Sequence, residues 1–131
     1  MEPFVATLVY FVISVVIVLI GLFIFELMTK KYKDLVAVQE GNEAVAMSIA
    51  GKIIGICIIL SFAIYHSNEI YETLIWGIYG VALQLVAYVL FDLFTRKFSV
   101  EDQLLKNNKA VGILSMGVSI GLAFVVGASI T

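Results

Sequence analysis

Charge is scarce in this sequence, and so are cysteine and proline. Charged residues make up 14% of the 131 positions, whereas a soluble domain is typically about a quarter charged. The single cysteine, Cys57, excludes an internal disulfide framework. The single proline, Pro3, leaves the long apolar stretches uninterrupted. The net charge of −2 comes with no basic cluster of the kind that binds nucleic acid.

Hydrophobic residues are abundant instead, at 62% of the chain. A chain of this length cannot bury so much apolar surface in its own interior, so lipid must cover part of it. A transmembrane helix needs about 20 mostly apolar residues. The sequence predicts an all-α, polytopic membrane protein with one membrane domain, residues 1–131, and four spans at about 4–28, 42–65, 71–94 and 108–131.

The basic residues predict an orientation in the membrane. Apart from Lys52, every Lys and Arg lies in or next to the segments 29–41 and 95–107. Because positively charged loops stay in the cytoplasm, we expect both segments inside and both termini and the short turn at 66–70 outside. The first span lacks a basic leading segment and is too long for a signal peptide, so we expect it to be retained. The expected location is the bacterial cytoplasmic membrane.

The two halves of the chain, 1–65 and 66–131, repeat each other at a spacing of 66 residues. Phe25-Glu26-Leu27-Met28-Thr29-Lys30-Lys31 aligns with Phe91-Asp92-Leu93-Phe94-Thr95-Arg96-Lys97. Asn42 aligns with Asn108, and two glycines align as well. Each half holds two spans, so the halves insert in the same orientation as parallel repeats. The expected architecture is a four-helix bundle with a pseudo-two-fold axis.

Two acids and two amides occupy matching repeat positions near the predicted cytoplasmic boundary. These are Glu26 with Asp92, and Asn42 with Asn108. Carboxylates inside spans often mark ion or proton paths, which makes a functional polar cluster one hypothesis. The alternative is structural: the asparagines act as helix N-caps, and the acids pair with neighbouring cations, Lys30, Lys31, Arg96 or Lys97.

Lys52 is the deepest charge, ten residues past Asn42, or roughly 15 Å along the helix. Its repeat equivalent is Val118, so this charge has no counterpart in the second half. Gln84 lies at a similar depth on the third span. One hypothesis gives Lys52 a buried partner, either Gln84 or an acid, or an aqueous cavity. The other has its side chain extend to the headgroups.

Two glycine pairs at matching positions predict helix packing. Gly51 and Gly55 on the second span, and Gly117 and Gly121 on the fourth, have the four-residue spacing that lets helices approach closely in lipid. We expect the second and fourth spans to pack through both pairs. His66 stands alone in the outer turn, so no metal site is expected, and no residue pattern indicates a cofactor.

The matched acid-x-x-Thr-basic helix ends, the Glu40–Ala46 segment and its echo at Lys106–Gly112 carry a resemblance to a known family. The chain resembles the YshE/YjfL family of small bacterial transmembrane proteins (domain of unknown function 350), YshE-type members above all. The resemblance covers essentially the whole chain. It implies a multi-pass protein of the bacterial cell membrane and brings no catalytic residue with it.

Two functions fit these features. The first is a non-enzymatic subunit or scaffold of the bacterial envelope, since the loops are short and no catalytic pattern is present. The alternative is a small oligomeric ion or solute channel or transporter using the polar residues inside the spans. The expected partners are the lipid bilayer and either further copies of the chain or another membrane protein, with no nucleic acid.

Overall fold

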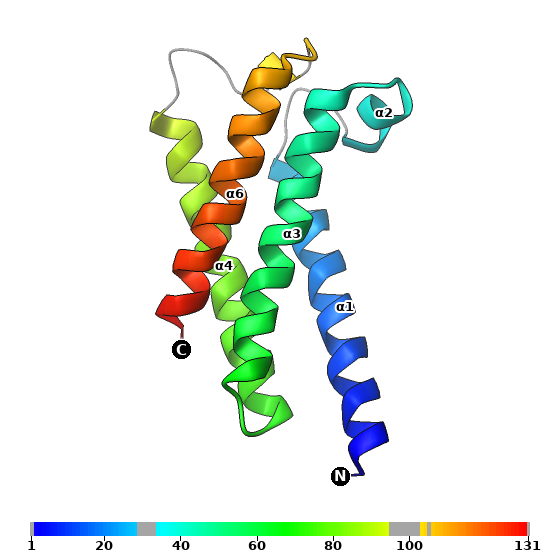
Figure 1. The fold of residues 1–131 in the computed structure, drawn as a ribbon, viewed down its shortest axis with the longest axis vertical. Coiled ribbons are helices and arrows are strands. Elements are labelled where there is room, and N and C mark those ends of the chain that lie inside the picture. Colours follow the sequence, from blue (N-terminus) through cyan, green and yellow to red (C-terminus); the bar gives the residue numbers. More distant parts are fainter. Residues whose placement is uncertain (1, 29–33, 95–102, 105, 131) are drawn as a thin grey trace.

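The computed structural model is a bundle of four long helices (Figure 1) and describes residues 2–28, 34–94, 103–104 and 106–130. The long helices are α1 (Pro3–Met28), α3 (Glu43–Tyr65), α4 (Ile70–Phe94) and α6 (Lys109–Ser129). Each has the length and apolar composition needed to cross a membrane, and the described residues contain no strand. The all-α membrane class and the four spans are confirmed.

The helices begin where local sequence favours a start. Pro3 is the first residue of α1, where its missing N–H costs nothing. The Asn42 side chain accepts a hydrogen bond from the Val45 N–H at the start of α3, and Asn108 accepts one from Val111 at the start of α6. Both N-cap asparagines have nearly the same backbone conformation, with φ at −76° and ψ at 99° and 97°.

The bundle has two distinct ends. Residues 66–69 join α3 to α4 at one end, which we call the turn end, and both termini point toward it (Figure 1). The opposite end, which we call the loop end, carries the short helix α2 (Asp34–Gln39) and the start of α6 (Figure 1). The charged segment 29–41 reads as a loop in the sequence, but Asp34–Gln39 within it form α2, which packs against α3.

Helix α3 is the centre of the bundle. It packs most extensively against α6, then against α4, and it also contacts α1 and α2. Helix α1 lies at the edge and packs mainly against α3 and α4. An exact two-fold axis would relate α1 to α4 and α3 to α6, so the contact between α3 and α4 would recur between α6 and α1. Among the described residues, the contact between α1 and α6 is much smaller than that between α3 and α4, so the bundle departs from this symmetry.

Three groups of buried side chains hold the helices together. The first joins α1, α3 and α4, the second lies at the loop end, and the third joins α3 to α6. Leu104 belongs to the second group, where it is buried against Ala44 and Val45. Part of the predicted loop 95–107 is therefore anchored on the bundle by apolar burial. The outer faces of the long helices are apolar and exposed, as a lipid-facing surface requires.

Candidate functional site

The ammonium group of Lys52 is enclosed by aromatic rings inside the bundle. Lys52 is only 3% exposed, and its Nζ lies 5.2 Å from the Phe25 ring centroid and 5.0 Å from that of Tyr88. The two rings meet edge to face with centroids 5.5 Å apart. Ring faces attract a cation electrostatically, and this attraction grows when water is absent. The two rings therefore supply part of the stabilisation that the ammonium loses on leaving water.

The lysine side chain runs toward the loop end while it stays buried. Lys52 is nine residues past the start of α3, whereas Phe25 is three residues from the end of α1 and Tyr88 six from the end of α4. The ammonium therefore lies closer to the loop end than its own Cα does. Lys52 is buried, as the first hypothesis required, but among the described residues its partners are two aromatic rings and not Gln84 or an acid.

Gln84 of α4 forms a separate contact, with α6. It is 1% exposed, and its Nε2 donates a hydrogen bond to the Ser119 carbonyl oxygen at 2.8 Å. Gly55 makes room for this bond, because a Cβ at that position would lie 3.1 Å from both Gln84 Nε2 and the Ser119 oxygen. The Gln84 Oε1 has no hydrogen-bond partner, so the expected bond between Lys52 and Gln84 is not formed.

A row of hydroxyl groups lies on the α6 side of Lys52 and its two aromatic rings. The Oγ atoms of Ser48 and Ser115 lie 3.3 Å apart, and the Tyr88 hydroxyl lies 3.5 Å from Ser115 Oγ. Ser48 and Ser115 are each 1% exposed. Because Tyr88 contributes its ring to the lysine and its hydroxyl to the serines, it links the two groups.

Two buried polar atoms of this interior lack a partner, Gln84 Oε1 and Ser119 Oγ. In an apolar interior, each unpaired group costs about 1–3 kcal/mol. Native structures satisfy most such groups, so each one requires an explanation. Together with the Lys52 ammonium, these atoms make the middle of the bundle the polar part of an otherwise apolar membrane domain.

Asn42 and Asn108 lie elsewhere, at the loop end, where they join the two halves. Besides capping α3, Asn42 donates from Nδ2 to the Leu104 carbonyl oxygen at 2.8 Å, and Asn108 donates to Gln103 Oε1 at 2.9 Å. Both asparagines are helix caps, as one of the two hypotheses required. The structure does not bring them into contact with Lys52 or Gln84, so the six polar candidates do not form one cluster.

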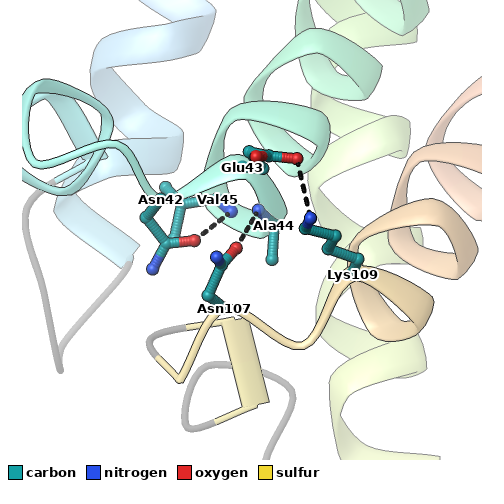
Figure 2. A network of polar contacts seen from close by, with 6 residues as sticks. All are labelled: Asn42, Glu43, Ala44, Val45, Asn107 and Lys109. Atoms are coloured by element: carbon teal, nitrogen blue, oxygen red, sulfur yellow. Dashed lines mark hydrogen bonds and ion pairs between the residues drawn. The ribbon is translucent and has the colours of Figure 1, made fainter.

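Figure 2 shows the polar contacts that join the start of α3 to the start of α6. The Asn107 Oδ1 accepts a hydrogen bond from the Ala44 N–H at 3.0 Å, and Lys109 Nζ lies 3.2 Å from the Glu43 carboxylate (Figure 2). Asn107 has a left-handed backbone, with φ of 60°, as does Gly41 at the matching repeat position, with φ of 85°. The local geometry before each helix is therefore the same in both halves.

Glu26 is half-buried near the end of α1. Asp92 lies in the last turn of α4, and its side chain is outside the described part of the structure, as are Lys30, Lys31, Arg96 and Lys97. The expected pairs between the two acids and these four basic residues therefore fall outside the described residues. Within the described part, Lys52 forms no ion pair with an acid.

The glycine pairs behave differently in the two halves. A Cβ at Gly51 would lie 2.7 Å from the Met116 Cα, so the backbones of α3 and α6 meet there. Gly55 lies at the same contact, facing Ser119. A Cβ at Gly117 or at Gly121 would have no atom within 4 Å, and both glycines are exposed. The prediction that they pack against the second span is wrong: α6 presents a different face to α3.

That face of α6 carries small residues that the Gly117–Gly121 spacing does not indicate. Gly112, Ser115, Ser119 and Ala123 recur every three or four positions and are all buried. The sequence also gave no reason to select Phe25, Tyr88 and Ser48 as neighbours of the buried polar residues. The available signal for the packing face of α6 was the spacing of its two serines, Ser115 and Ser119, which lie one helical turn apart in a membrane span.

The other polar candidates stay isolated. Cys57 is exposed on α3. His66 lies at the end of α3 with its ring stacked on Phe62. Among the described residues, no group of three or more His, Cys, Asp or Glu side chains is placed to hold a metal ion.

Four apolar helices with a few buried polar side chains define a polytopic α-helical membrane protein. The family model described as Domain of Unknown Function (DUF350) matches residues 1–130, and the chain belongs to this family. It is 37% identical over 121 residues to the UPF0719 transmembrane protein YshE of Bacillus subtilis (strain 168), covering 92% of this chain and 90% of that relative. The resemblance found in the sequence is thereby confirmed. No solved structure matches the chain.

Proposed function

We propose that this protein is a non-enzymatic subunit or scaffold of a membrane assembly in the bacterial envelope. It contributes helices and membrane-embedded surface to that assembly and performs no chemistry of its own. The observation that carries the proposal is the closed interior. Five polar side chains of this interior are each at most 3% exposed: Lys52, Gln84, Ser48, Ser115 and Ser119. A substrate or solute would have to separate α3 from its neighbours to reach them.

The hollows beside α1 support the same proposal, because their linings are mainly apolar. Two hollows flank α1, one of about 400 Å³ against α4 and one of about 440 Å³ against α3. Branched aliphatic side chains make up most of the lining against α4 and half of the lining against α3. Surfaces of this kind face lipid tails or neighbouring helices.

We further propose that the protein resides in the bacterial cytoplasmic membrane with both termini outside. The support is the distribution of basic residues, all of which except Lys52 belong to the loop end or to the segments that follow α1 and α4. A reporter that functions only outside the cytoplasm, fused after Thr131, should be active. Activity of a cytoplasmic reporter at the same position would contradict this orientation.

A second candidate, an ion or solute pathway formed by several copies, is favoured by one specific observation. The unpaired Gln84 Oε1 and Ser119 Oγ lie in the same interior as the Lys52 ammonium. Polar groups of this kind inside a membrane domain often line a pathway. In this candidate, the helices would open in an oligomer and the acids Glu26 and Asp92 would contribute to the pathway.

Two measurements separate the candidates. The scaffold predicts that the tagged chain, extracted gently from its native membrane, retains a second membrane protein in fixed stoichiometry, and that the purified chain gives liposomes no ion flux above that of empty vesicles. Flux that is abolished by Lys52→Met or Glu26→Gln in a folded protein would contradict the scaffold and support the pathway. The matched control is Lys109→Gln, which removes an exposed cation at the loop end.

A further inference from the structure

The turn end of the bundle contains a small polar pocket that the proposed function does not use. Its volume is about 280 Å³, close to the lower limit of about 300 Å³ for small-molecule sites. It differs from the hollows beside α1 because polar atoms make up much of its lining. Three elements form it, the end of α3, the start of α4 and the end of α6, through Ala63, His66, Ser67, Glu72, Trp76 and Ile130.

The electrostatics of the pocket favour a cation. Glu72 supplies a carboxylate. Its Oε2 accepts a hydrogen bond from the Asn68 N–H at 3.2 Å. No Lys or Arg occurs between residues 53 and 95, the stretch that contains the whole turn end of α3 and α4. Helices α3 and α6 both end beside the pocket, and helix C-termini carry partial negative charge. The start of α4 carries partial positive charge, so the negative charge of the pocket comes from Glu72 and from the ends of α3 and α6.

An aromatic side chain, Trp76, also lines the pocket. Trp76 lies one helical turn beyond Glu72, so both side chains are on the same side of α4. Its ring is stacked on Tyr79, with centroids 5.9 Å apart and an angle of 12° between the planes. A carboxylate beside an indole is the combination that binds organic ammonium groups, and indole gives the strongest cation–π attraction among the side chains.

We propose that this pocket binds the ammonium group of a zwitterionic phospholipid headgroup, as in phosphatidylethanolamine, in the leaflet at the turn end. The ammonium pairs with the Glu72 carboxylate and lies against the Trp76 ring. Tyr65 and Tyr71 are exposed near the same end of the spans, the pattern of a headgroup-level aromatic belt. A headgroup at this level reaches the pocket without leaving the membrane surface. A divalent metal ion is a poorer fit because Glu72 is the one acid among the described residues of the lining.

The site carries its own spectroscopic probe, since Trp76 is the single tryptophan of the chain. The full-length protein in a neutral detergent is titrated with a short-chain phosphatidylethanolamine while Trp76 emission is recorded. We expect a saturable change in emission. Short-chain phosphatidylglycerol, which lacks the ammonium, should give no saturable change, and an equal response to both lipids would overturn the proposal. Free ethanolamine should bind much more weakly, and equal binding would overturn the assignment to a lipid.

Glu72→Gln tests the carboxylate and should weaken lipid binding by about tenfold, the loss expected for one charge-assisted hydrogen bond. Glu69→Gln is the matched control, because Glu69 is an acid in the same turn outside the pocket lining, and its binding should equal that of the parent. Unchanged binding in Glu72→Gln would overturn the proposal. Should that variant fail to fold, Trp76→Leu replaces it, with retained phosphatidylethanolamine counted by native mass spectrometry. Retention equal to that of the parent would again overturn it.

Discussion

The Asn107 side chain caps a helix of the other half of the chain: its Oδ1 accepts the hydrogen bond of the Ala44 N–H, 3.0 Å away and 63 residues earlier. Ala44 is fully buried, so its N–H has no access to water once Asn107 is removed. Asn107→Gly tolerates the left-handed backbone and deletes only the cap, which should cost about 1 kcal/mol of stability. Asn107→Ala should cost roughly 1–2 kcal/mol more, because alanine resists that conformation.

Thermal unfolding of the two Asn107 variants in detergent measures both the loss of the cap and the cost of the left-handed backbone. Gly41→Ala is the matched control for the backbone term, since Gly41 has φ of 85° and no neighbour within 4 Å of a built Cβ. If Asn107→Gly is as stable as the parent, the hydrogen bond between Asn107 and the Ala44 N–H contributes nothing to stability.

The glycines of α3 and α6 provide a second matched pair. Gly51→Ala places a Cβ 2.7 Å from the Met116 Cα, so α3 and α6 must separate, at a cost of about 1–3 kcal/mol. Gly117→Ala meets no atom and should leave stability unchanged or raise it by up to about 1 kcal/mol, because alanine favours helix. Equal losses in both variants, measured by thermal unfolding, would mean that α6 turns its glycine face toward α3.

The buried lysine should be dispensable for folding. Removing the charge with Lys52→Met forfeits ring contacts worth up to about 2 kcal/mol. It also removes the desolvation penalty of an ammonium, which amounts to several kcal/mol. We therefore expect the variant to be at least as stable as the parent when unfolded by denaturing detergent. A large loss of stability would indicate that the ammonium has a stronger partner than the two rings.

The ion pair between Glu43 and Lys109 should contribute little. Both side chains are more than half exposed, at 61% and 55%, and such pairs typically contribute about 0–1 kcal/mol. A double-mutant cycle with Glu43→Gln and Lys109→Gln isolates the coupling energy. We expect less than about 1 kcal/mol, decreasing with added salt. A coupling well above that, or one insensitive to salt, would contradict the expectation.

The sequence predicted the elements of this fold better than their rotation about their own axes. The spans follow from hydropathy alone, and the N-caps Asn42 and Asn108 follow from their place before an apolar run. The face that α6 presents to α3 did not follow. The amphipathic signal of α6 is weak because most of its residues are apolar, and its packing face is marked only by the spacing of Ser115 and Ser119 rather than by Gly117 and Gly121.

The candidate site was predicted in part for a similar reason. Lys52 and Gln84 are conspicuous because a charge and an amide are rare in mid-span, and both are buried in the structure. Their partners are ordinary residues of a membrane protein. Nothing in the sequence distinguishes Phe25 and Tyr88 from other aromatic residues, since their role depends on three helices meeting at one depth. Asn107 escaped notice because its hydrogen bond spans the two halves.

The contact between α3 and α6 has a consequence for how the protein is made. Helix α3 finds its largest packing surface on α6 and part of its N-terminal cap on Asn107, and the ribosome delivers both last. When α1 and α3 have been inserted and α6 has not, the face of α3 that carries Gly51 and Gly55 therefore still faces lipid. Insertion of the spans precedes their assembly, as membrane helices generally require. The final bundle can close only when synthesis of the chain is almost complete.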